Sequence, residues 1–153
     1  MTDRTAFGGK TIYGARVGIL ILDAKHPRIP GDPNNAGTWP FPVLYKVVHQ
    51  ATPGRIIFER GEGLLDAFKK GADELIAEGA DGITATCGFL ALFQKELAMH
   101  CKIPVATSSL MQVPFVQRLL PPGKRVGVLT VWKSELSADH LERHGGMDGY
   151  IAA

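Results

Sequence analysis

The stretch Arg16-Val17-Gly18-Ile19-Leu20-Ile21-Leu22-Asp23 decides the fold that this chain is expected to adopt. Its apolar run is continuous from Val17 to Leu22 and has the length of a strand. Runs of this kind are typical of a central strand that is covered on both faces, as in parallel α/β sheets. The run is also far too short to span a bilayer, so no membrane segment is expected.

Strand-like and helix-like segments alternate along the rest of the chain. The sequence predicts strands at 43–48, 55–59, 82–86, 104–107 and 125–131, and helices at 63–78, 89–100, 110–120 and 136–144. The clearest helix, 63–78, has one apolar stripe and is followed by Gly79, where a helix stop is expected. Strands that alternate with helices imply a parallel sheet with right-handed crossovers. We therefore expect the α/β class, with a Rossmann- or flavodoxin-like lobe.

Composition narrows the class of protein. The chain has 153 residues, 45% of them apolar and 21% charged, and a net charge of +2. Its Lys and Arg residues are scattered, whereas a nucleic-acid surface needs a basic stripe. The N-terminus lacks the apolar segment of a signal peptide, so the cytoplasm is the default compartment. In that reducing environment Cys87 and Cys101 are expected to be free thiols.

An internal similarity bears on the domain organisation. The stretch 16–20 (RVGIL) recurs almost unchanged as 125–129 (RVGVL). Either the first strands of α/β units simply resemble one another, or a second lobe begins at Arg125 and is cut off. The expected division is a polar, glycine-rich, flexible arm over 1–14, an α/β lobe over 15–124 and the beginning of an incomplete second lobe over 125–153.

Candidate site residues follow from strand ends, because open parallel sheets bind ligands beyond the carboxyl ends of their strands. Cys87 follows a predicted buried strand and opens a predicted helix, so the helix dipole and free N–H groups would favour its thiolate. Gly88 would let a ligand approach the backbone, and Thr86 adds a hydroxyl. The alternative is that Cys87 only packs in the core, as free cysteines often do. Cys101 is expected to be structural.

Other polar groups fall in the same zone, and each has two interpretations. Asp23 ends the first strand. In the loop 30–39, Asn34 and Asn35 would bind a carboxylate under a lid, or the loop is only a turn cluster. Ser108 and Ser109 would bind substrate, or they cap the helix that follows. The histidines show no metal-ligand spacing, and no GxGxxG or P-loop favours a nucleotide. We expect no metal and no cofactor.

Several stretches together resemble the aspartate/glutamate/hydantoin racemase family. The segment 86–90 (TCGFL) is similar to the first-cysteine motif of that family. The segments 29–35 (IPGDPNN) and 41–48 (FPVLYKVV) resemble the loop and strand after the first strand in uncharacterised members, and 104–110 (PVATSSL) resembles the strand and turn after the first catalytic helix. The resemblance runs from about Gly14 to about His144.

The resemblance implies a fold of two similar lobes, of which this chain would supply the first and the start of the second. It implies an isomerase, a cofactor-independent racemase that acts at the α-carbon of an amino acid or a related small carboxylic acid. In such enzymes a cysteine from each lobe flanks the substrate. Cys87 would be the catalytic thiol, and the substrate-binding residues would be Asp23, Asn34, Asn35, Thr86, Gly88, Ser108 and Ser109.

The sequence departs from the family pattern at the second cysteine. It contains no Glu-Cys-Thr or Gly-Cys-Thr turn, so the chain would hold half of a two-base site. One alternative is a single-cysteine enzyme similar to the decarboxylases or maleate isomerases of the same superfamily. Another is a catalytically inactive, truncated lobe that only binds a small acid or self-associates, as a homo-oligomer.

Overall fold

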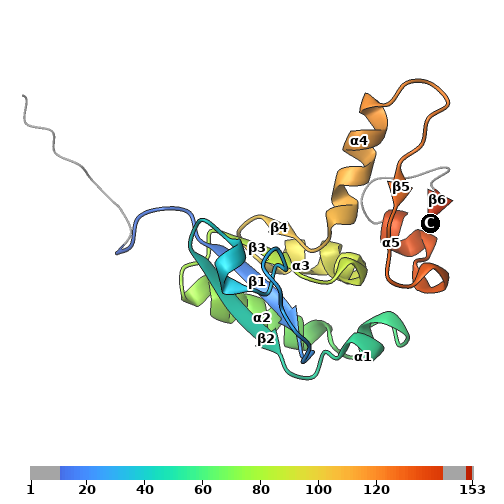
Figure 1. Ribbon diagram of the computed structural model, residues 1–153. Coiled ribbons are helices and arrows are strands. Elements are labelled where there is room, and N and C mark those ends of the chain that lie inside the picture. The colour runs from blue at the N-terminus through green and yellow to red at the C-terminus, as the bar shows by residue number, and fades with distance from the viewer. Residues whose placement is uncertain (1–10, 143–150, 153) are drawn as a thin grey trace, which may run out of the picture.

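The computed structural model describes residues 11–142 and 151–152 (Figure 1). Its main sheet has four parallel strands in the order β2-β1-β3-β4. These strands are β1 (Val17–Leu22), β2 (Val43–Val48), β3 (Gly82–Ala85) and β4 (Val105–Ala106). Since β1 pairs with both β2 and β3, it is an inner strand of the sheet, as its apolar run predicts. The expected α/β fold with a parallel sheet is confirmed.

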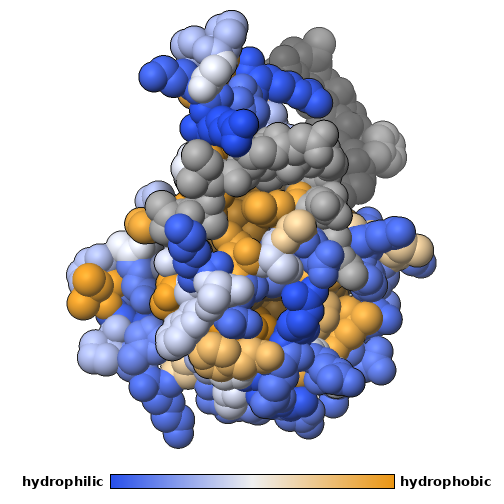
Figure 2. All heavy atoms as spheres, turned by 90° about the vertical axis from the view of Figure 1, so that its right-hand side faces the viewer, coloured by the Kyte–Doolittle hydropathy of each residue, from blue (hydrophilic) through white to orange (hydrophobic). Residues whose placement is uncertain are grey.

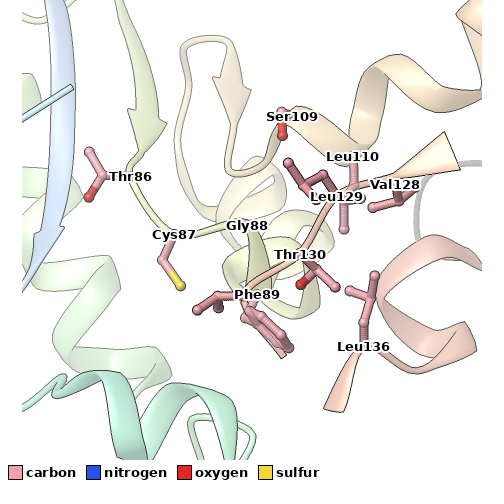
Figure 3. A pocket seen from close by; sticks show the side chains of 11 residues that line it. Thr86, Cys87, Gly88, Phe89, Ser109, Leu110, Val128, Leu129, Thr130 and Leu136 are labelled. Atoms are coloured by element: carbon pink, nitrogen blue, oxygen red, sulfur yellow. The ribbon is translucent and has the colours of Figure 1, made fainter. Parts of the chain in front are cut away.

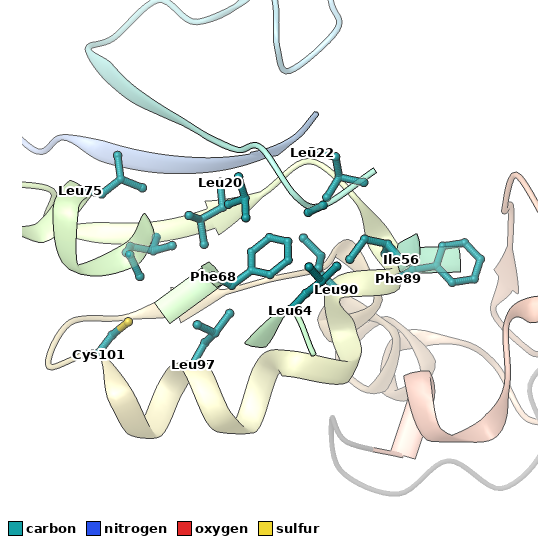
Figure 4. Close-up of a cluster of buried hydrophobic side chains, with 14 of the residues drawn as sticks. Leu20, Leu22, Ile56, Leu64, Phe68, Leu75, Phe89, Leu90, Leu97 and Cys101 are labelled. Carbon is teal, nitrogen blue, oxygen red and sulfur yellow. The ribbon is translucent and has the colours of Figure 1, made fainter. Parts of the chain in front are cut away.

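The main core lies between the sheet and helix α2 (Leu65–Ala77). Figure 4 shows Phe68 of this helix at the centre of the cluster, between Leu20 of β1 and Leu97. Two glycines let the helix lie close to the strand. A Cβ at Gly18 would come within 3.1 Å of the Leu75 side chain, and one at Gly71 within 3.1 Å of Leu20. Such contacts are tighter than close-packed interiors normally allow.

The predicted strand over 55–59 is wrong, because this segment forms helix α1 (Pro53–Ile57). The backbone N–H of Arg55 donates to the Thr52 hydroxyl at 3.4 Å, and Pro53 occupies the first turn. A Thr cap followed by proline is a helix start, since proline lacks only an N–H that the first turn leaves unpaired anyway. The apolar residues after Pro53 masked this signal.

The predicted helices over 89–100 and 110–120 each begin as a 3-10 helix. The first is η2 (Gly88–Phe93) followed by α3 (Gln94–His100), and the second is η3 (Ser109–Gln112) followed by α4 (Val113–Leu119). Both therefore start beside the carboxyl ends of β3 and β4. Among the described helices, none is long and apolar enough to cross a membrane.

The segment after α4 departs most from expectation. The predicted strand over 125–131 is reduced to β5 (Gly127–Val128), which pairs with β6 (Ile151–Ala152) in a separate two-stranded sheet. Between them lie η4 (Lys133–Glu135) and α5 (Ala138–Glu142). In Figure 1, α4, β5 and α5 stand away from the main sheet.

This segment also carries apolar side chains at its surface. Figure 2 shows the face with α5 and β5, where hydrophobic residues lie among polar ones. Leu129, Val131 and Trp132 are exposed, Leu129 to 95%. The division into lobes at residue 125 stays a prediction. Most of the expected arm (1–10) and of the tail (143–150 and 153) lies outside the described residues.

Candidate functional site

A cavity of about 280 Å³ lies beyond the carboxyl end of β3 (Figure 3). Its described lining consists of Thr86, Cys87, Gly88, Phe89, Ser109, Leu110, Val128, Leu129, Thr130, Val131 and Leu136. Every one of these side chains is uncharged. Six of these side chains are apolar, and the Cys87 thiol and three hydroxyl groups add a comparable polar share to the walls. We call this space the thiol cavity.

Cys87 is the residue immediately before η2, and its backbone is extended, with φ −122° and ψ 118°. The backbone N–H groups of Phe89 and Leu90 approach its sulfur. Burial raises the pKa of the Cys87 thiol above its ordinary value, and these two N–H groups lower that pKa by less. The N–H groups at the helix start therefore act in the direction that favours the thiolate, but they are not the dominant effect on this pKa. The six residues of η2 supply two N–H groups, and desolvation outweighs them.

A second cavity, of about 390 Å³, lies on the other side of the same strand ends. Its described lining consists of Ile19, Pro33, Trp39, Thr84, Ala85, Thr86, Ala106, Ser108, Ser109, Met111 and Gln112. These side chains are uncharged too, and four of them carry hydroxyl groups. We call this space the hydroxyl cavity. Thr86 and Ser109 line both cavities and so form the boundary between them.

The loop that follows β1 is a tightly hydrogen-bonded turn cluster. Asn35 caps the short 3-10 helix η1 (Ala36–Thr38): its Oδ1 accepts from the Gly37 N–H at 2.8 Å. Its Nδ2 donates to the Arg28 carbonyl at 2.8 Å. The Trp39 indole N–H donates to the Pro33 carbonyl at 2.9 Å. The Asn35 amide is thus engaged within the loop, as the turn-cluster interpretation expects.

Asn34 instead links this loop to the site. The Arg28 guanidinium can only donate, so it fixes the orientation of the Asn34 amide: its oxygen accepts from both Arg28 Nη atoms at 3.1 Å. The amide nitrogen then donates to Thr86 Oγ1 at 3.3 Å. Arg28 is itself held by Asp32, at 3.2 Å. Sequence reasoning missed Arg28, although its spacing of four residues from Asp32 is a signal of an ion pair.

The two serines behave differently. The Ser108 hydroxyl accepts from the Leu110 N–H at 3.1 Å and caps η3, so the capping interpretation holds for Ser108. The same buried side chain also lines the hydroxyl cavity. Ser109 is exposed between the two cavities. Gly88 lies close by, because a Cβ there would be 3.7 Å from Ser108 Oγ.

Asp23 lies outside the linings of both cavities. Its Oδ2 is 3.4 Å from His49 Nδ1 at the end of β2. The structure thus brings Thr86, Cys87, Gly88, Ser108 and Ser109 together, adds Asn34 behind Thr86, and leaves Asp23 and Asn35 aside. Phe89, Leu136 and Trp39 line the cavities although sequence reasoning did not select them. Apolar residues of this kind carry no signal that separates a cavity wall from a core.

Comparison with known proteins finds no matching family model but several curated relatives, all of them lyases. The chain is 27% identical over 134 residues to a dimethylsulfoniopropionate lyase of Durusdinium sp. clade D, and this alignment covers 84% of the chain and 44% of the relative. It is 30% identical over 139 residues to dimethylsulfoniopropionate lyase 7 of Emiliania huxleyi, and this alignment covers 86% of the chain and 40% of the relative. The chain therefore spans less than half the length of these relatives.

Among solved structures, the chain is similar to the crystal structure of an aspartate racemase homologue from Pyrococcus horikoshii OT3. The TM-score is 0.52 at 14% sequence identity, over 92% of this chain and 65% of that one. At this identity the similarity concerns the fold. The resemblance to the racemase family thus holds at the level of architecture.

The expected reaction needs correction. The curated relatives are lyases, which break a bond within the substrate, so the racemase or isomerase assignment is wrong. The same finding overturns the alternatives of a decarboxylase and a maleate isomerase. A thiol at the carboxyl end of a parallel sheet can transfer protons in many different reactions. The residues around Cys87 therefore did not distinguish a racemase from a lyase. The fold of this chain is similar to that of an aspartate racemase homologue, whereas its curated sequence relatives are lyases.

Proposed function

We propose that this chain forms part of a lyase that cleaves the carbon–sulfur bond of dimethylsulfoniopropionate or a close sulfonium carboxylate, with Cys87 as the proton-abstracting group. The observation that carries the proposal is the similarity to dimethylsulfoniopropionate lyases along more than four-fifths of the chain. The Cys87 thiol beside an uncharged cavity supports it from the structure.

The reaction is a β-elimination. The Cys87 thiolate takes a proton from the carbon next to the carboxylate and becomes a thiol. The electron pair of that C–H bond forms the new C=C bond, and the pair of the C–S bond leaves with sulfur. The substrate thus divides into acrylate and neutral dimethyl sulfide, and the thiol returns its proton to solvent. One base suffices, because the second step is bond cleavage and not reprotonation from the opposite face.

The character of the thiol cavity suits this substrate. A sulfonium group brings a positive charge to the thiolate, which finds no cationic side chain in the described lining. The nearby charge would favour ionisation of Cys87 once the substrate is bound. The methyl groups would contact Phe89, Leu110 and Leu136, and an aromatic face also attracts a cation.

Release of dimethyl sulfide tests the proposal. The chain is incubated with dimethylsulfoniopropionate and the headspace gas is analysed. We expect Cys87→Ala to lower the rate by about 10²-fold to 10⁴-fold, the usual contribution of a general base. Cys101→Ala is the matched control, because that thiol lies in the core, and it should keep the rate. A Cys87→Ala variant as active as the wild type would overturn the role of Cys87, and a wild type that releases no dimethyl sulfide would overturn the reaction as one that this chain carries out.

A further inference from the structure

We infer that the hydroxyl cavity is a carboxylate-binding site in which the Thr86 and Ser108 hydroxyls donate to the anion, and that Arg28 is a positioning residue for this site through Asn34. The inference rests on the proposed function in one respect: the carboxylate would be that of the sulfonium substrate. The reasoning starts from the direction of each hydrogen bond around the cavity.

The direction of the hydrogen bond at Thr86 is set by Arg28 and Asn34. Arg28 has only donors, so it holds the oxygen of the Asn34 amide, at 3.1 Å from each Nη. The Asn34 NH2 group must then face Thr86, and it donates to Oγ1 at 3.3 Å. A hydroxyl that accepts in this way keeps its own proton to donate elsewhere. Thr86 therefore offers an O–H donor, and Thr86 lines the hydroxyl cavity.

The hydrogen bond at Ser108 likewise makes the hydroxyl oxygen the acceptor. Its Oγ accepts from the Leu110 N–H at 3.1 Å, so its proton is also available to an acceptor. The side chain is 7% exposed and lines the same cavity, where an unused donor would be costly. Thr84 does not compete for the ligand, because its hydroxyl donates to the Ala106 carbonyl at 2.8 Å.

The described lining of the hydroxyl cavity thus has two O–H donors with fixed directions and no charged side chain. Such a cavity favours a ligand group that accepts hydrogen bonds. A carboxylate meets that requirement, and a zwitterion meets it best because it brings its own cation. Thr86 also lines the thiol cavity, so the two cavities adjoin at this residue. Figure 3 shows the Thr86 side chain apart from the apolar walls around Phe89 and Leu136, as a division into two subsites requires.

Binding of propionate tests the inference. Propionate has the carboxylate and carbon chain of the proposed substrate but no leaving group, and its affinity is measured by NMR titration of the full chain. Asn34→Asp keeps the size of the side chain and the contact with Arg28 but reverses the bond to Thr86, whose proton would then point at Asp. We expect propionate to bind about tenfold more weakly, or worse, because one donor is lost and a like charge is added. Ala36→Asp adds the same charge at an exposed position of the same loop, and it should stay within about twofold of the wild type, as surface charges usually do.

Arg28 is tested by coupling. Arg28→Met should weaken propionate several-fold in the wild type and have little further effect in an Asn34→Ala background, because Arg28 acts through Asn34. Equal effects of Arg28→Met in both backgrounds would overturn the positioning role. Wild-type affinity in Asn34→Asp, or no saturable propionate binding by the wild type, would overturn the carboxylate site. These outcomes do not depend on release of dimethyl sulfide, so the site and the lyase reaction can fail separately.

Discussion

The two cysteines of this chain occupy opposite kinds of environment. Cys87 is half-buried and lines the thiol cavity, beside the carboxyl ends of the strands. Cys101 follows the end of α3, is 6% exposed and belongs to the main core, where Figure 4 shows it near Leu97. Burial is the first cause that raises the pKa of both thiols. They differ in the second cause, because N–H groups lower the pKa of Cys87 and the Asp73 carboxylate raises that of Cys101 further.

This difference shows that neither the burial of a cysteine nor its residue type alone determines whether it can act as a catalytic base. A desolvated thiolate is a strong base only where a substrate reaches it. Cys87 combines partial burial with a cavity and two N–H groups, whereas Cys101 combines deeper burial with packing alone. The comparison therefore makes predictions in which the two cysteines must respond in opposite ways.

The largest expected effect is on the pH dependence of turnover. Burial raises the pKa of Cys87, so the thiol is protonated at neutral pH and the reactive thiolate increases as the pH rises. We expect kcat/KM for release of dimethyl sulfide to rise about tenfold per pH unit, or about 10²-fold from pH 6.5 to pH 8.5. Cys101→Ala should leave the profile unchanged. A profile that is flat over this range would argue against a thiolate base.

The next effect is on stability, and here substitution of Cys101 is expected to have the larger effect and substitution of Cys87 the smaller. Cys101→Ser buries a hydroxyl among apolar side chains and should lower the free energy of unfolding by about 1–3 kcal/mol. Cys87→Ser should cost less than about 1 kcal/mol, because a serine oxygen at this position can accept the same backbone N–H groups as an N-cap. Urea denaturation of the two variants measures both values. A larger loss in Cys87→Ser than in Cys101→Ser would contradict the assignment of Cys101 to the core.

The four strands of the main sheet were predictable from sequence, because apolar runs of this length favour strands. The ends of these strands indicate where a ligand would bind, and the site itself stays a prediction. The helix at Pro53 was missed, since Ile56 and Ile57 have strand propensity that outweighed the Thr52 cap. The limits of β5 were missed because Val126 to Val131 carries no mark of where pairing stops. The link from Arg28 to Thr86 joins residues far apart in sequence, and no local pattern reveals it. The type of reaction depends on the ligand, which the residues around Cys87 do not specify alone.

The smallest expected effect comes from the outer wall of the thiol cavity. Leu136 lines this cavity and is half-buried. Leu136→Ala should open access to the sulfur and raise the rate of alkylation of Cys87 by iodoacetamide about two- to fivefold, a modest change expected of a locally opened segment. The rate at Cys101 should not change, because that thiol does not line the thiol cavity and is buried within the main core. Faster reaction at both cysteines would indicate general loosening of the structure and not an opened cavity.

Competitive alkylation of the native chain tests the central claim most directly. The chain is treated with a limiting amount of iodoacetamide at pH 8.5, and peptides that contain Cys87 and Cys101 are quantified by mass spectrometry. The structure predicts that Cys87 reacts at least about tenfold faster, since reaction requires an accessible thiolate. Equal rates, or faster reaction at Cys101, would contradict a ligand-accessible thiol at the end of β3.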